Sequence, residues 1–177
     1  MITAFRNPTT LTFEDYEPRA SIIDPNDASI SDAFTSFDFE LLPNLPAERH
    51  NGRFRLSRSM SLSITPVALI RDDAAATDPG MPSLLSHEQL HYDVGFVIAR
   101  QLARELNVID AATERGLKDK LDELIELHFH TRARLIQTRY DREANHGANH
   151  HFQRLWKANM AKCLADPHAH QIGGWML

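Results

Sequence analysis

Apolar residues in the first 80 positions recur at every second residue, which is the pattern of a β-strand with one buried face. The clearest case is the segment 53–64, whose alternate positions are mostly arginine or serine and whose apolar members are Phe54, Leu56, Met60, Leu62 and Ile64. Arg58 occupies one of the otherwise apolar positions of this alternation, which predicts a bulge or an edge position. Shorter alternations occur at residues 11–13 and 36–41. The first half of the chain is therefore predicted to be rich in strands.

After Pro82 the spacing changes to three and four residues, which is typical of helices with one buried face. The spacing predicts helices over about 83–106, 117–140 and 150–165, with an irregular tail after Pro167. Strands followed by helices favour an α+β fold, in which an antiparallel sheet precedes the helices. We expect one domain over residues 1–177, strand-rich at 1–80 and helical at 83–165.

Composition narrows the classes of function. The net charge is −5, which argues against a dedicated nucleic-acid-binding protein. No apolar run approaches the roughly 18 residues of a membrane helix, so we expect no membrane partner. The first residues lack the basic and apolar regions of a signal peptide, which makes a cytoplasmic location the default expectation. Cys163 is the single cysteine, so no intramolecular disulfide can form.

Nine of the ten histidines lie between His87 and His170, and two of them form an HExxH motif. Within a helix, His87 and His91 project from one face and can ligate one zinc ion, while Glu88 stands beside the metal as general base for a bound water. The motif lies inside a predicted helix, which is the context that this chemistry needs. It predicts a zinc site.

Catalytic zinc normally has three protein ligands, so one more must come from another segment. The segment 140–151 offers the densest choice: Asp141, Glu143, His146, His150 and His151. His146 is the first candidate, because it is a neutral nitrogen ligand and precedes Gly147, where the backbone can turn sharply. Asp141 is the alternative, either as ligand or as the group that fixes the tautomer of a ligand histidine. The weaker candidates are His128, His130, His168 and His170.

Three other features have a chemical and a structural interpretation. Tyr140 can donate its hydroxyl to a developing oxyanion, or it can simply pack at the end of its helix. Asp93 can support a ligand histidine or be a solvated helix residue. The arginines at 132, 134, 139 and 142 can bind nucleic acid, but in an acidic chain a solvated helix face is the better interpretation.

The segments HEQLHYDV and YDREANHGANHHFQRLW together resemble a bacterial family described as secreted zinc-dependent proteases. That family pairs an HEQxHxD helix with a downstream YDxxTxHG segment, and the resemblance covers roughly residues 53–160, with Ala144 in place of the threonine. It implies a zincin-like fold, with His87 and His91 as zinc ligands and Glu88 as base. It also implies a histidine at the position of His146.

The sequence therefore predicts a zinc metallopeptidase that acts on peptide or protein substrates. In this interpretation the strand 53–64 lies at the sheet edge above the helix of the motif, where an extended peptide can add as a further strand. The alternative is a zinc-stabilised binding module without catalysis. The presence of Glu88 favours the enzyme, because a structural zinc site needs no base.

Overall fold

The computed structural model describes residues 1–25, 28, 30–42, 47–74 and 80–177, and its fold is α+β. The strand-rich half contains a short 3-10 turn, η1 (Phe13–Asp15), and the strands β1 (Thr3–Arg6), β2 (Glu17–Arg19), β3 (Ala33–Leu42), β4 (Ala47–His50), β5 (Arg53–Leu56) and β6 (Ser61–Arg71). The helical half contains α1 (Met81–Leu106), β7 (Asp110–Ala111), α2 (Glu114–Ile125), the π-helical η2 (Glu126–Ala133), α3 (Arg134–Ala144), α4 (His150–Ala165), β8 (Gln171–Ile172) and β9 (Trp175–Met176).

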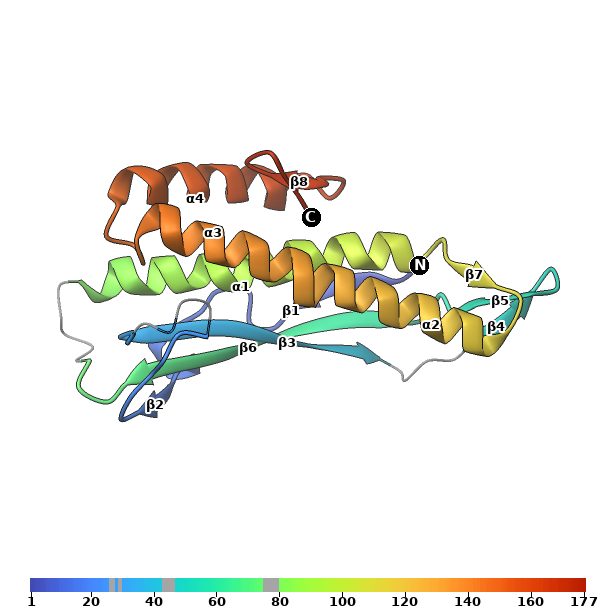
Figure 1. The fold of residues 1–177 in the computed structure, drawn as a ribbon, viewed down its shortest axis with the longest axis horizontal. Coiled ribbons are helices and arrows are strands. Elements are labelled where there is room, and N and C mark those ends of the chain that lie inside the picture. Colours follow the sequence, from blue (N-terminus) through green and yellow to red (C-terminus); the bar gives the residue numbers. More distant parts are fainter. Residues whose placement is uncertain (26–27, 29, 43–46, 75–79) are drawn as a thin grey trace.

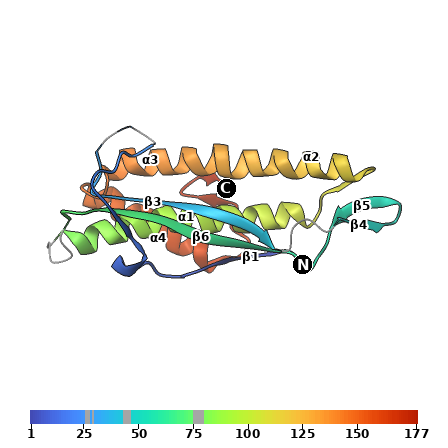
Figure 2. The same ribbon diagram turned by 90° about the horizontal axis from the view of Figure 1, so that it is seen from below.

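The helices stack on one face of the main sheet (Figure 1). Helix α1 lies between the sheet and α4, and the continuous rod made of α2, η2 and α3 runs alongside α1 (Figure 2). The small sheet of β4, β5 and β7 lies at one end of the molecule, whereas β2 lies at the other (Figure 1). Helix α1 is thus the central element, and its residues Val94, Val97, Ile98 and Leu102 are fully buried.

The expectation of an antiparallel sheet is wrong in part, because the main sheet is mixed. Strand β6 is its centre: β3 pairs with it antiparallel over its length, while β1 and β2 pair with its two ends in parallel. Parallel neighbours need long connections, and more than 40 residues separate β2 from β6. Alternation predicts which face of a strand is buried, but it carries no information on the direction of the partner strand.

The predicted strand 53–64 is also wrong in its extent and its place. It divides at a turn, closed by Met60 N–H donating to the Ser57 carbonyl at 3.3 Å, into β5 and β6. The turn contains Arg58, the residue that interrupts the alternation of apolar and polar positions. Strand β5 is the middle strand of the small sheet and β6 is central in the large one, so neither forms the sheet edge expected to receive a peptide.

The helical predictions are confirmed with small changes of bounds. The predicted helix 83–106 is α1, and 150–165 is α4. The predicted helix 117–140 extends over α2, η2 and α3, and its middle is π-helical. The buried residues Leu117, Leu121, Phe129 and Ala133 are spaced by four or eight residues, which overruns the α-helical period of 3.6, and the wider π turn restores their common face. The tail, predicted to be irregular, forms the hairpin β8–β9 instead.

Gly95 lies midway along α1, where the helix crosses Phe37 of β3. A Cβ on Gly95 would lie 2.8 Å from Phe37 Cε1, well inside van der Waals contact. Gly95→Ala should therefore push α1 away from β3 and lower the free energy of unfolding by about 1–3 kcal/mol, measured by urea denaturation. The cost should shrink in a Phe37→Leu background, where the ring is removed. Equal stability of Gly95→Ala and wild type would contradict this close packing.

Candidate metal centre

The HExxH motif lies in the second and third turns of α1, and its side chains are buried. His87, Glu88 and His91 are 1%, 4% and 5% exposed. The i and i+4 spacing brings the two imidazoles together, with His87 Nε2 and His91 Nε2 3.2 Å apart. The helix geometry expected from the sequence therefore places both Nε2 atoms where they could contact the same ion.

Asp141, in the last turn of α3, completes this group. Its Oδ1 lies 2.8 Å from His91 Nε2 and 3.2 Å from His87 Nε2. The side chain is 4% exposed, and the three ligand atoms all lie within 4.8 Å of one another. His87, His91 and Asp141 thus form a buried group that could bind a metal ion.

Buried polar atoms without partners indicate that the arrangement fits a metal. Among the described residues, Asp141 Oδ2, His91 Nδ1 and Glu88 Oε2 have no hydrogen-bond partner. Leaving such atoms buried and unpaired costs free energy. A cation bound by the Asp141 carboxylate would offset the cost at Asp141 Oδ2, although His91 Nδ1 faces away from the group. The mixture of nitrogen and oxygen donors is one that zinc accepts.

The carboxylate also favours the protonated form of His91. Burial lowers the pKa of His91, but the neighbouring carboxylates, Asp141 above all, outweigh burial and raise it to about 8. Burial in turn raises the pKa of Asp141, and the two histidines together hold it well below its ordinary value. Asp141 is therefore an anion at neutral pH, in the place where a cation would bind.

Gln153 of α4 fixes the orientation of His87. Its Oε1 lies 3.2 Å from His87 Nδ1 and accepts a hydrogen bond from the Tyr140 hydroxyl at 2.6 Å. With the proton on Nδ1 for this bond, the lone pair of His87 Nε2 faces His91 and Asp141. Gln153 could not be predicted from the sequence, because a glutamine on a helix carries no signal of its own.

Tyr140 is completely buried and stacks on His87, with ring centroids 4.5 Å apart. Burial raises the pKa of its hydroxyl, so the group is a neutral donor. Its hydrogen bond to Gln153 helps to position the residues around His87. Donation of the Tyr140 hydroxyl to an oxyanion stays a prediction.

His146 lies at the rim of the same site. It follows the end of α3 in a left-handed conformation (φ 49°), its side chain is 37% exposed, and its Nδ1 lies 4.0 Å from Asp141 Oδ1. The next residue, Gly147, also has positive φ, and a Cβ there would meet His87 Cβ at 3.4 Å. The sharp turn expected at Gly147 is confirmed. His146 as third ligand stays a prediction, but its ligand atoms are not part of the converging group that Asp141 completes.

The remaining candidates lie outside this group. Glu143 accepts a hydrogen bond from Trp156 Nε1 and pairs with Arg139. His128 is buried next to Glu105, 3.2 Å from its Oε2. The other histidines considered as ligands are exposed: His130, His150, His151, His168 and His170.

Segments before and within β3 close the site from the sheet side. The resulting hollow, the metal pocket, has a volume of about 10 Å³ and is lined by His87, Glu88, His91, Asp141, His146, Asp24, Ser31 and residues 33–35. Asp24 is 5% exposed and was missed by sequence analysis, because a single aspartate in a loop resembles an ordinary turn residue.

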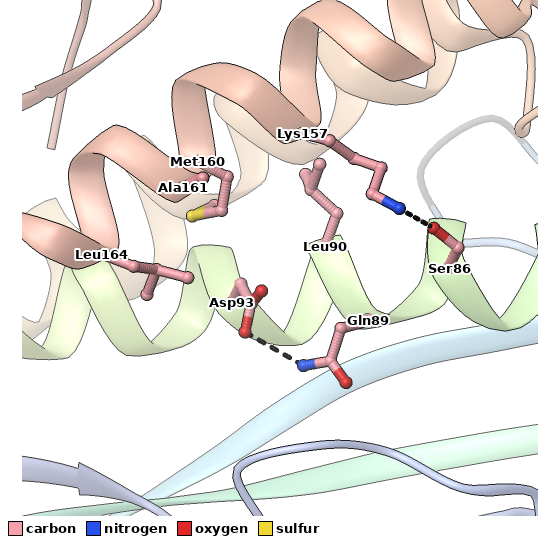
Figure 3. A pocket seen from close by; sticks show the side chains of 8 residues that line it. All are labelled: Ser86, Gln89, Leu90, Asp93, Lys157, Met160, Ala161 and Leu164. Atoms are coloured by element: carbon pink, nitrogen blue, oxygen red, sulfur yellow. Dashed lines mark hydrogen bonds between the residues drawn. The ribbon is translucent and has the colours of Figure 1, made fainter.

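Asp93 belongs to a different face of α1. It lines a hollow between α1 and α4 and accepts a hydrogen bond from Gln89 Nε2 at 3.0 Å (Figure 3). It also pairs with Arg6 of β1. Lys157 of α4 donates to Ser86 Oγ across the same hollow. Asp93 is therefore neither a solvated residue nor a contact of the ligand histidines, but ties β1 to α1.

Two arginines of the basic cluster make internal contacts. Arg132 donates to the Leu177 carbonyl at 2.6 Å, and Arg139 pairs with Glu143 and lies over the Trp175 ring. No helix among the described residues has the length and apolar character needed to span a bilayer. Comparison of the chain with protein-family models, curated proteins and solved structures finds no match.

Proposed function

We propose that the chain is a zincin-like, zinc-dependent metallopeptidase, as the resemblance of its two motifs implies. The observation that carries the proposal is a buried glutamate beside a buried ligand group. Glu88 and the group of His87, His91 and Asp141 line one pocket, and Glu88 Oε2 has no hydrogen-bond partner among the described residues. A purely structural metal site needs no such group.

His87, His91 and Asp141 would hold the zinc ion. When bound, zinc polarises the scissile carbonyl and acidifies a water. Glu88 accepts a proton from the attacking water and passes it to the leaving amine as the peptide bond breaks. Gln153 and Tyr140 keep the His87 ring in the orientation that this chemistry needs.

The expected substrate is an extended peptide. Within the described residues β3 pairs with β6 alone, so its other edge is open to a further strand. Phe34 and Thr35 of β3 line the metal pocket, which supports placing the peptide along this strand rather than along the predicted strand 53–64.

Removal of the metal tests the proposal. Treatment with a chelator is expected to abolish hydrolysis of a mixed peptide substrate, and one equivalent of zinc should restore it while magnesium does not, because the ligand set suits zinc. Zinc bound at one equivalent without any hydrolysis would favour the zinc-stabilised binding module instead. Hydrolysis that persists without metal would contradict both interpretations.

A further inference from the structure

A larger hollow adjoins the metal pocket. It has a volume of about 420 Å³, lies between β3 and the rod of η2 and α3, and shares Phe34 with the metal pocket. We call it the aromatic groove; its lining includes Phe34, Phe37, Phe39, Phe129, Arg134 and Gln137. The metal pocket has room for about one water or ion. Substrate side chains must therefore be recognised outside it.

The floor of the groove is aromatic. Phe39 of β3 stacks on Phe129 of η2 with ring centroids 4.0 Å apart, and Phe37 lies 5.7 Å from Phe129. The open edge of β3 forms one wall, where a peptide backbone can pair. An apolar side chain of that peptide would lie against the phenylalanine rings.

Gln137 of α3 carries an unused polar group. It is only 6% exposed, lines the groove, and forms no hydrogen bond with any residue that the structure describes. Its amide reaches the groove with both its donor and its acceptor free of any described partner, so a peptide backbone lying there can pair with them.

Arg134 gives the groove a charge. It is exposed, lines the groove, and forms no ion pair within the described part of the chain. Arg134 precedes Asp141 by seven residues, which is about 10 Å along the helix axis. An extended peptide covers that length in about three residues. Asp38 and His130 also line the groove, but at the end where Phe39 meets Phe129, farther from the metal pocket.

We propose that the aromatic groove selects peptides with a large apolar side chain on the phenylalanine floor and an acidic side chain on Arg134, about three residues from the cleaved bond. Gln137 holds the backbone of the same segment. This inference rests on the proposed peptidase function and names its substrate class.

Binding can be measured separately from cleavage. The probes are two acetylated, amidated pentapeptides with a central phenylalanine and terminal alanines, one with glutamate and one with lysine on both sides of the phenylalanine. Calorimetry with zinc-loaded Glu88→Gln protein, which should not consume them, is expected to show at least tenfold tighter binding of the glutamate peptide. Arg134→Glu should reverse this preference. Arg154→Glu, the same charge change at an exposed site on α4 outside the groove, should retain it.

Gln137→Leu separates recognition from stability. It should weaken both peptides about tenfold while the melting temperature stays close to that of wild type, because Gln137 makes no hydrogen bond with the described residues that the variant would break. A lower melting temperature with unchanged peptide binding would overturn the role of Gln137. Equal affinity of wild-type protein for the two peptides, or equal effects of Arg134→Glu and Arg154→Glu, would overturn the proposed selection.

Hydrolysis of the same peptides by wild-type protein tells the two proposals apart. Selective binding without hydrolysis would keep the groove assignment and refute the peptidase. Hydrolysis of both peptides at equal rates and affinities would keep the peptidase and refute the selection of acidic substrates.

Discussion

Replacing Asp141 with alanine is expected to lower the affinity for zinc by more than about 100-fold, since loss of a mere supporting contact of a metal site already costs 10- to 100-fold. Asp141 Oδ1 lies 2.8 Å from His91 Nε2 and 3.2 Å from His87 Nε2, so within the part of the chain that the structure describes it is the carboxylate that converges on both imidazoles. Without it, two ligands from a single helical turn would hold only one side of the ion. Competition with a chromophoric chelator measures the change.

Two further variants make this result specific. Asp119→Ala removes an exposed carboxylate on α2 and should leave zinc affinity unchanged. His146→Ala removes the rim histidine and should cost less than about tenfold, as expected for a group outside the ligand set. If His146→Ala loses zinc while Asp141→Ala retains it, His146 is the third ligand and the assignment of Asp141 is wrong.

Glu88→Gln is expected to leave zinc bound and to lower the rate of peptide hydrolysis by at least about 100-fold, the contribution typical of a general base. The amide has nearly the size of the carboxylate, but it cannot accept the proton of the attacking water. Steady-state kinetics together with the zinc content of the same preparation measures both effects.

Glu123→Gln serves as the matched control, because it makes the same change at an exposed position of α2. It should match wild type in both measurements. Turnover by Glu88→Gln at the wild-type rate would refute the assigned role of Glu88, although the metal site itself would survive.

The part of the site that a single helix determines could be predicted from the sequence. Helical periodicity around His87 and His91 identifies α1, and the i, i+4 spacing then brings the two imidazoles together. The glycine at 147 predicts the turn after α3 in the same local way. In each case the relevant geometry is fixed within a few residues of the chain.

The part that depends on packing between distant segments could not be predicted. Whether Asp141 or His146 meets the histidines depends on the rotation of α3 about its axis, which the π-helical segment before it changes. Gln153 and Asp24 reach the site only because α4 and the loop before β3 pack there. The parallel pairing of β1 and β2 with β6 is likewise a long-range choice that alternation does not encode.

A crystal structure of the zinc-loaded protein, with anomalous diffraction recorded on both sides of the zinc absorption edge, tests the metal centre most directly. The expected result is one zinc peak within about 2.0–2.2 Å of His87 Nε2, His91 Nε2 and an oxygen of Asp141, with a water in the open position beside Glu88. Zinc bound elsewhere, or a fourth protein ligand in place of the water, would contradict a catalytic metal centre at the HExxH motif.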